Sequence, residues 1–379
     1  MYNSVFVMDK YADTRDARFL ARALRYANFI RKWLPMAQLR TAVDAFVTDA
    51  SRRAVILRLL DTVAAERSEP AAPAPTATAA TAPAAAPSME VEAGAEAPAA
   101  SEAPSVAKES APPAAAPLPL KAPKVSASAA AEVEAYFLNV ALSMLASQKQ
   151  FAALLPAASE AASHLQEQNK RTLDMFTARA TTYWSLALQQ HTGSSAELRA
   201  HLTRAHRTAC LRHDEYGQAV YINLLLHSLL AERAYEAASK LIAKATFPEA
   251  VSNNQLARYL YYKGRVQAVQ LEYSDAYTSL LQASRKAPHS ALRFRADVAK
   301  ASVVVQLLTG DIPERSSFTS EAALVRALEP YFRLAKAVRA GDVESFGAVL
   351  TELQDVFAAD GTLSLVNRLQ ANVIKTGLR

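Results

Sequence analysis

The segment ARYLYYKGRVQAVQLEYSDAYTSLLQASRKAP, residues 257–288, decides the fold class of this chain. It carries five tyrosines and five lysine or arginine residues. Such residues can act in catalysis, stack on nucleic-acid bases or pack between helices. The spacing of the small residues in the same segment separates these possibilities.

One glycine, two alanines, a leucine and a proline follow the spacing of a tetratricopeptide helical hairpin. Small residues let the two helices approach closely, the leucine packs between them, and the proline ends the unit. The tyrosine, alanine and aliphatic positions of the second helix recur about one repeat earlier, at Tyr235, Ala238 and Ile242. We therefore expect an all-α, tetratricopeptide-like solenoid in which these residues pack the repeat: Gly264, Tyr273, Ala276, Leu280, Ala283 and Pro288. The same pattern predicts that Tyr259 and Tyr262 lie between stacked helices.

The composition limits the cellular compartment in which the protein is expected. No run of eighteen uncharged apolar residues occurs, so we expect no membrane span, and acidic residues near the start argue against a secretory signal. Cys210 is the only cysteine of the 379 residues, which excludes an internal disulfide. This suits a reducing compartment, and we expect a cytoplasmic and nuclear protein.

Four regions follow from the pattern along the chain. Residues 1–66 have helical spacing, with an apolar stripe that includes Leu20, Leu24 and Ile30. Residues 67–130 hold twelve of the eighteen prolines and no aromatic residue, which predicts a disordered Ala/Pro-rich linker. Residues 131–310 predict a helical-repeat solenoid, and 311–379 continue as helices. Between residues 131 and 379, helix breaks are expected at several positions: Pro156, Gly193, Gly217, Pro248, Pro288 and Pro330. The β-branched run at 302–308 keeps a helical register and is expected to be a buried helix.

Common catalytic and cofactor motifs are absent from the sequence. No two of the nine glycines are closer than six residues, so neither GxGxxG nor GxxxxGK[ST] can occur. HExxH and GxSxG are also missing. We therefore expect no catalytic residues, no cofactor and no enzymatic activity.

One possible metal site lies at His206, Cys210 and His213, which share a helical face at positions i, i+4 and i+7. Histidine and cysteine are zinc ligands, but one straight helix rarely closes a tetrahedron, and a fourth ligand would have to come from Asp214, Glu215 or elsewhere. We therefore expect no metal here, but a small buried cysteine flanked by two histidines at the edge of a hairpin turn.

A local excess of positive charge surrounds the opening segment. Residues 253–300 hold eight lysines and arginines against three acidic residues. Such a run is often only a solvated face, but it can also bind an acidic protein or nucleic-acid phosphates. No RNA-recognition signature accompanies it, so an acidic protein partner is favoured, with contacts expected among seven residues: Arg258, Lys263, Arg265, Arg285, Lys286, Arg293 and Arg295.

Five segments of the second half resemble the non-ATPase regulatory subunit 3 family of the 26S proteasome. They are TACLRHDEYGQAVYINLLL (208–226), NNQLARYLYYKGRVQAVQLEYSDAYTSLLQASRKAP (253–288), LLTGDIPER (307–315), LEPYFRLAKAVRAGDVESFGAVL (328–350) and FAADGTLSLVNRLQANVIKTGLR (357–379). The similarity extends from about residue 132 to the last residue, and both the order and the spacing of the segments match.

This resemblance implies a PCI protein, in which helical repeats lead into a winged-helix module. Residues 311–379 would be the helical part of the PCI domain, and the winged helix that follows in the family is expected to be absent from this chain. The implied role is a non-catalytic scaffold in the lid of the regulatory particle. The implied partners are the lid subunits numbered 6 and 8 and a small acidic tether subunit. The alternative is a PCI or helical-repeat scaffold of another complex, such as the signalosome, a translation initiation factor or an mRNA-export complex, with RNA contact.

Overall fold

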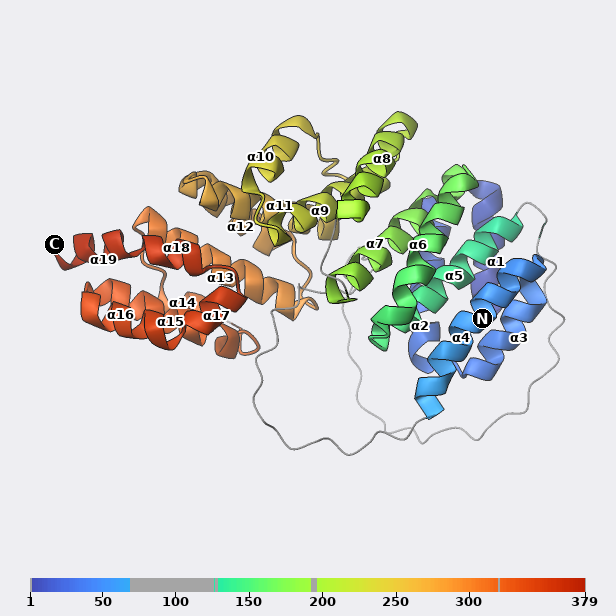
Figure 1. The fold of residues 1–379 in the computed structure, drawn as a ribbon, viewed down its shortest axis with the longest axis horizontal. Helices are drawn as coiled ribbons and strands as arrows, with labels where there is room; N and C mark the ends of the chain where they lie inside the picture. The colour runs from blue at the N-terminus through green and yellow to red at the C-terminus, as the bar shows by residue number, and fades with distance from the viewer. Residues whose placement is uncertain (1, 69–125, 127–128, 192–195, 320, 379) are drawn as a thin grey trace, which may run out of the picture. The chain divides into compact units, whose positions relative to one another are not determined.

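The computed structural model describes residues 2–68, 126, 129–191, 196–319 and 321–378, and throughout these ranges the regular structure is helical. The chain forms two compact units, of which the first extends to Ala187 and the second begins at Leu188 (Figure 1). This confirms the expected all-α helical-repeat class. Among the described helices, none is both long and apolar enough to cross a membrane.

The first unit is built around one helix that is buried on nearly every side. Helix α5 (Ala130–Ser147) has fourteen buried residues, polar ones such as Asn139 and Ser143 included. It packs against all of α1 to α4 and against α6. The elements of this unit are α1 (Tyr2–Thr14), α2 (Ala17–Trp33), α3 (Met36–Phe46), α4 (Ala50–Ser68), α5, α6 (Phe151–Glu167), the 3-10 turn η2 (Arg171–Leu173) and α7 (Asp174–His191), which crosses the boundary. The apolar stripe predicted for α2 is buried in this core.

The second unit is a series of helical hairpins. Its elements are α8 (Ala196–Arg212), α9 (Glu215–Ala231), α10 (Tyr235–Lys244), α11 (Asn253–Val269), α12 (Tyr273–Lys286), α13 (Leu292–Thr309), α14 (Arg315–Thr319), α15 (Val325–Ala340), α16 (Val343–Glu352), α17 (Gln354–Ala359), α18 (Leu363–Arg368) and α19 (Gln370–Gly377). Helix α11 packs against its hairpin partner α12 and also against α9 and α13, the first helices of the neighbouring layers. The run 302–308 lies in α13 and is largely buried, as predicted.

Two of these hairpins repeat with a constant period. Every helix boundary of α9 and α10, except the end of α10, recurs 38 residues later in α11 and α12: Glu215 with Asn253, Ala231 with Val269, and Tyr235 with Tyr273. The tyrosine that opens the second helix is therefore an equivalent position in both hairpins. The repeat inferred from Tyr235 and Ala238 is a real structural period.

The tight turns of the chain share one hydrogen-bonding pattern. Arg233 and Leu271 both have left-handed backbone, with φ of 57° and 73°. The next N–H then donates to the carbonyl five residues earlier, which satisfies a group that the helix end leaves without a partner. This bond joins Ala234 to Leu229, Glu272 to Gln267, Gln150 to Leu145, Asp214 to Ala209, Asp311 to Gln306 and Thr362 to Phe357, at 2.9–3.2 Å.

Three of the expected helix breaks are wrong. Pro156 lies inside α6 and Pro330 inside α15, each at the sixth position. A proline there removes one intrahelical hydrogen bond near the start of a helix, and the buried neighbours on the same helix outweigh that loss. Gly217 lies in the first turn of α9, where its N–H donates to Asp214 Oδ2 at 3.1 Å and so caps the helix.

Other expectations fall on residues that the structure does not describe. The break at Gly193 and nearly all of the linker at 67–130 are among them. The division after Ala187 lies within the range 131–310 that the sequence presented as one solenoid. The domain boundaries at 66, 130 and 310 remain predictions.

The contact between α11 and α12 depends on the absence of a side chain at Gly264. A Cβ atom at this position would lie 2.8 Å from Leu280 Cγ and 3.2 Å from the Ala276 carbonyl oxygen. Ala276, Leu280 and Ala283 are fully buried on the facing helix, whereas Tyr273 and Pro288 are half-buried. The two helices therefore meet at a glycine facing a leucine.

Gly264→Ala should destabilise the protein although alanine favours helix formation. The added methyl group overpacks the contact, which costs about 1–3 kcal/mol, whereas the gain in helix propensity is about 1 kcal/mol. The matched control is Gly347→Ala in α16, where nothing lies within 4 Å of the new Cβ. The control should be neutral or stabilising in urea unfolding followed by circular dichroism. Equal effects of the two substitutions would contradict the close contact.

Candidate functional site

The tyrosines of the opening segment lie inside the second unit. Tyr259 stacks on Phe247 with ring centroids 4.2 Å apart and planes 9° from parallel. Tyr261 meets Phe294 edge to face at 5.5 Å, and Tyr262 meets His227 edge to face at 5.8 Å. Tyr259, Tyr261 and Tyr262 are all less than one-tenth exposed. Their rings fill the space between α11 and its neighbours.

Burial also sets the protonation of this aromatic cluster. Loss of solvation raises the pKa of Tyr262 to about 12, so the phenol stays neutral. The pKa of His227 falls to about 4, mainly through burial and further through Arg265 and Arg258. The ring of His227 is therefore neutral at physiological pH. A neutral histidine packs against Tyr262 without adding another charge beside the two arginines.

Arg265 points into this interior. Its guanidinium lies 5.7 Å from the centroid of the Tyr261 ring. The nearby Tyr261 phenol raises the pKa of Arg265, with burial acting in the opposite direction. A Cβ at Gly361 would lie 2.9 Å from Arg265 Nη2, so the guanidinium packs against the turn between α17 and α18. Arg265 thus joins the repeat to the C-terminal helices.

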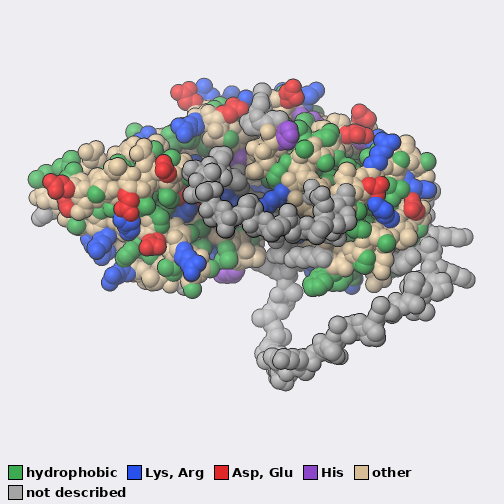
Figure 2. Space-filling model, turned by 60° about the horizontal axis from the view of Figure 1, so that its bottom comes forward, with side chains coloured by type: hydrophobic (Ala, Val, Ile, Leu, Met, Phe, Trp, Pro, Cys, Tyr) green, Lys and Arg blue, Asp and Glu red, His purple; other side chains and the backbone are tan. Residues whose placement is uncertain are grey.

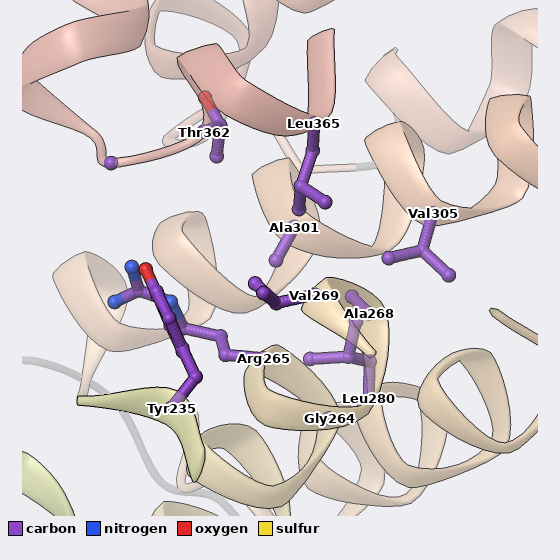
Figure 3. Close-up of a pocket in the computed structure, with 11 residues that line it drawn as sticks. Tyr235, Gly264, Arg265, Ala268, Val269, Leu280, Ala301, Val305, Thr362 and Leu365 are labelled. Atoms are coloured by element: carbon purple, nitrogen blue, oxygen red, sulfur yellow. The ribbon is translucent and has the colours of Figure 1, made fainter. Parts of the chain in front are cut away.

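A small hollow lies between these elements. It is lined by Tyr235 of α10, Arg265 of α11, Ala301 of α13 and Leu365 of α18, among others. Tyr235 and Arg265 lie side by side, and Leu365 points toward Ala301 (Figure 3). The hollow has a volume of about 10 Å³, which is room for roughly one water molecule. It is a packing space between helices, too small for a cofactor.

Asp360 is the centre of a hydrogen-bonded network beside the hollow. It accepts from Lys300 Nζ at 2.8 Å and from the Tyr331 hydroxyl at 2.8 Å. The Tyr331 hydroxyl also lies 2.9 Å from Thr362 Oγ1. Burial, followed by the charge of Asp360, raises the pKa of Tyr331, which therefore remains a donor. The network joins α13, α15 and the turn before α18.

Two further side chains fasten the C-terminal helices by capping helix ends. Arg368 Nη1 of α18 donates to the Val269 carbonyl at 3.1 Å, at the end of α11. Asn372 Nδ2 of α19 donates to the Leu307 and Leu308 carbonyls at 3.0 Å, near the end of α13. These three bonds go to carbonyls of the last helical turns, which have no N–H donor four residues later in their own helix. The last helices are thus docked on the repeat by polar contacts as well as by apolar packing.

The seven basic residues predicted to contact an acidic partner do not form one surface. Arg285, Lys286 and Arg293 are exposed, whereas Lys263 is half-buried. Arg258 and Arg265 are half-buried among the tyrosines, and burial lowers the pKa of Arg258. Arg295 pairs with Glu321.

The exposed part of the basic excess is therefore smaller than the sequence count suggests. Lys300 is also neutralised, by Asp360. On the face shown in Figure 2, basic and acidic side chains are interspersed. The remaining exposed cations lie at the end of α12 and the start of α13. Binding of an acidic partner at these residues stays a prediction.

The histidine–cysteine cluster differs from its expected form. Cys210 is exposed, whereas the sequence favoured a buried thiol. Its Sγ lies 3.6 Å from His206 Nε2, and burial lowers the pKa of His206. His213 occupies the left-handed turn after α8, with φ of 56°. Within the described ranges, no group of three potential metal ligands is close enough to hold an ion.

The Asp360 network was not found from the sequence. The sequence pattern gives Asp360 no role, and it includes Lys300 only in the basic excess of residues 253–300. The separations in sequence are 60 residues from Lys300 and 29 residues from Tyr331. No local pattern indicates pairing over such distances. The buried tyrosine of the segment 328–350 was the one available signal, because a buried phenol needs a partner.

A sequence profile described as "PSMD3-like, N-terminal TPR repeats" matches residues 5–335. The chain belongs to this family. It is 46% identical over 249 residues to "26S proteasome non-ATPase regulatory subunit 3 homolog A" of Arabidopsis thaliana, covering 66% of this chain and 51% of that protein. It is 45% identical over 248 residues to "Probable 26S proteasome non-ATPase regulatory subunit 3" of Nicotiana tabacum, covering 65% and 50%.

A third relative of this PSMD3-like chain matches over a similar length. "26S proteasome non-ATPase regulatory subunit 3" of Dictyostelium discoideum is 44% identical over 249 residues, covering 65% of this chain and 49% of that protein. The chain spans about half the length of these curated relatives. The resemblance drawn from the five segments is confirmed.

Tyr331→Phe should lower the free energy of unfolding by about 2 kcal/mol, because the lost hydroxyl donates to a charged, partly buried carboxylate. It should also speed amide hydrogen exchange in α17 to α19, which the network attaches to α13 and α15. The control is Tyr277→Phe, since the Tyr277 hydroxyl makes no hydrogen bond within the described ranges. Similar stability and exchange in both variants would mean that the network does not anchor the C-terminal helices.

Proposed function

We propose that this chain is a non-catalytic scaffold subunit of the lid of the 26S proteasome regulatory particle, acting in ubiquitin-dependent protein degradation. The observation that carries the proposal is the family match over residues 5–335, together with relatives that are named as proteasome regulatory subunit 3. The architecture supports it, because stacked helical hairpins present an extended surface suited to holding neighbouring proteins.

The proposed partners are other PCI subunits of the lid, those numbered 6 and 8, and the small acidic tether subunit. Residues 311–379 would form the helical part of a PCI domain. The well-packed interior around Asp360 supports this role, since it gives the end of the repeat a defined shape on which neighbours can assemble. The proposed locations are the cytoplasm and the nucleus, where such a complex degrades its substrates.

Co-purification tests this proposal directly. An affinity-tagged copy of the full chain, expressed in cells of its source organism, should recover the proteasome lid subunits in near-equal amounts. Mass spectrometry of the purified complex measures them, and an equally tagged unrelated helical-repeat protein is the control. Recovery of signalosome, initiation-factor or mRNA-export subunits in their place would refute the proteasome assignment.

Within this function, we infer that the acidic tether subunit contacts the exposed cations at the junction of α12 and α13. Arg285 and Lys286 lie in the last turn of α12, and Arg293 lies in the first turn of α13. All three are exposed, so a partner can reach them at the surface of the folded hairpin. Charges at the rim of an interface mainly accelerate association.

Reversal of these three residues to glutamate should slow association with the acidic tether subunit by about tenfold and flatten its salt dependence. Stopped-flow binding at several salt concentrations measures both effects, and circular dichroism checks the helical content. The control variant reverses Arg326, Lys336 and Lys375, which are also exposed in the second unit and change the net charge equally. An equal loss in both variants would indicate a general charge effect rather than a contact.

A further inference from the structure

Helix α2 of the first unit has a second face that the core does not use. Five residues on this face are spaced by four, three, four and four positions, which places them along one side of the helix. We call them the arginine–aromatic stripe: Arg18, Arg22, Arg25, Phe29 and Trp33. All five are exposed, with Phe29 at 60% and Trp33 at 73%. At about 1.5 Å per residue, the stripe is roughly 22 Å long.

The opposite face of α2 packs against the core of the first unit. Leu20, Ala23, Leu24, Ala27 and Ile30 are buried in the core of the first unit. The exposed aromatics are therefore not needed to attach α2 to its own unit. They lie in line with the arginines, on the side that faces away from the core.

Among the described residues, no acidic side chain pairs with the arginines of the stripe. Residues 17–33 contain four arginines and one lysine and no acidic residue. Asp16, just before the helix, accepts from the Arg18 backbone N–H at 2.9 Å and so caps α2. In the part of the chain that the structure describes, no acidic side chain forms an ion pair with Arg18, Arg22 or Arg25.

The residue types of the stripe are those that dominate protein interfaces. Tryptophan and arginine are enriched among residues that contribute most to binding, where they lie in desolvated pockets ringed by other contacts. A single exposed apolar residue needs no explanation, but two large aromatics one helical turn apart, in line with three arginines, form a continuous amphipathic surface.

We propose that the arginine–aromatic stripe is a docking site for an acidic protein segment whose apolar side chains cover Phe29 and Trp33. Carboxylates of the segment pair with Arg18, Arg22 and Arg25, where arginine can form two parallel hydrogen bonds with each. The aromatic end supplies the apolar contact area. This site lies in the first unit and is independent of the proteasome assignment and of the cations on α12 and α13.

Nucleic acid fits the same surface less well. Affinity for nucleic acid rises with the number of phosphates neutralised, and the stripe offers three exposed cations on a convex helix. Binding of single strands usually requires a basic groove that follows the backbone. A helix-sized acidic segment can instead lie along the full length of α2 and meet charge at one end and aromatic rings at the other.

Trp33 provides a direct measurement of docking. The chain has two tryptophans, and Trp184→Phe leaves Trp33 as the single tryptophan, which can be excited selectively at 295 nm or longer wavelengths. The probe is a synthetic 20-residue helical peptide that carries, on one face, glutamates in one half and leucine and phenylalanine in the other half. Its addition to the full chain should shift the Trp33 emission to shorter wavelength, saturably and less strongly at high salt. Polyglutamate and a 20-nucleotide oligouridylate are the comparison ligands.

Two variants, made in the Trp184→Phe background, locate the site. Arg18→Glu combined with Arg22→Glu and Arg25→Glu should weaken peptide binding at least tenfold, and Phe29→Ser should weaken it by a similar factor. The control reverses Arg58, Lys170 and Arg171, which are exposed in the same unit and carry the same charge. It should bind as the parent does. Circular dichroism verifies folding. If the triple reversal is unstable, the double variant Arg22→Gln with Arg25→Gln replaces it in the binding measurement.

Several results would overturn the proposal. They are the absence of a Trp33 shift with the peptide, an equal loss of binding in the stripe variant and the control variant, and a shift with oligouridylate that exceeds the shift with the peptide. Binding of polyglutamate as tight as that of the amphipathic peptide would also count against it, because the aromatic half of the stripe would then have no role.

Discussion

The close approach of α11 and α12 at Gly264 is the contact on which the second unit depends. With no Cβ at this position, Leu280 of the facing helix lies against the backbone, and the Ala276 carbonyl follows closely. Helix α11 of this hairpin also contacts α9 on one side and α13 on the other. The boundaries of this hairpin repeat those of α9 and α10 with a period of 38 residues, as expected for stacked helical hairpins.

The interior of the second unit contains polar and charged groups as well as apolar side chains. Its tyrosines provide large apolar surfaces and also contact polar groups: Arg265, His227 and the Asp360 carboxylate. A buried polar group costs free energy unless it is hydrogen-bonded, so each such group restricts the arrangement of its neighbours. The Asp360 network and the caps from Arg368 and Asn372 therefore give α17 to α19 one defined position on the repeat. The proposed scaffold role would use such a fixed surface, because partner subunits would bind to it.

The positions of the basic residues in the structure change which of them are expected to contact a partner. A count of charge over 253–300 treats every lysine and arginine as equally available. In the structure, Arg265 packs on Tyr261, Arg295 pairs with Glu321, and Lys300 pairs with Asp360. The first unit shows the reverse case, since Arg18, Arg22 and Arg25 of α2 lie in line with exposed aromatics and form no ion pair with an acidic side chain that the structure describes. Interaction surfaces of this family member are therefore found by pairing and exposure rather than by local net charge.

The sequence by itself determined the helical class, the hairpin spacing around Gly264 and the family, because small-residue spacing and helical periodicity are local properties. It also indicated that the tyrosines pack rather than react. Only the tertiary structure decided which charges are paired, because Asp360 meets Lys300 and Tyr331 across long separations in sequence. The same holds for the prolines at 156 and 330, where packing of the whole helix outweighed a local preference. It also holds for Cys210, since burial depends on what covers a helix face and not on the residue that occupies it.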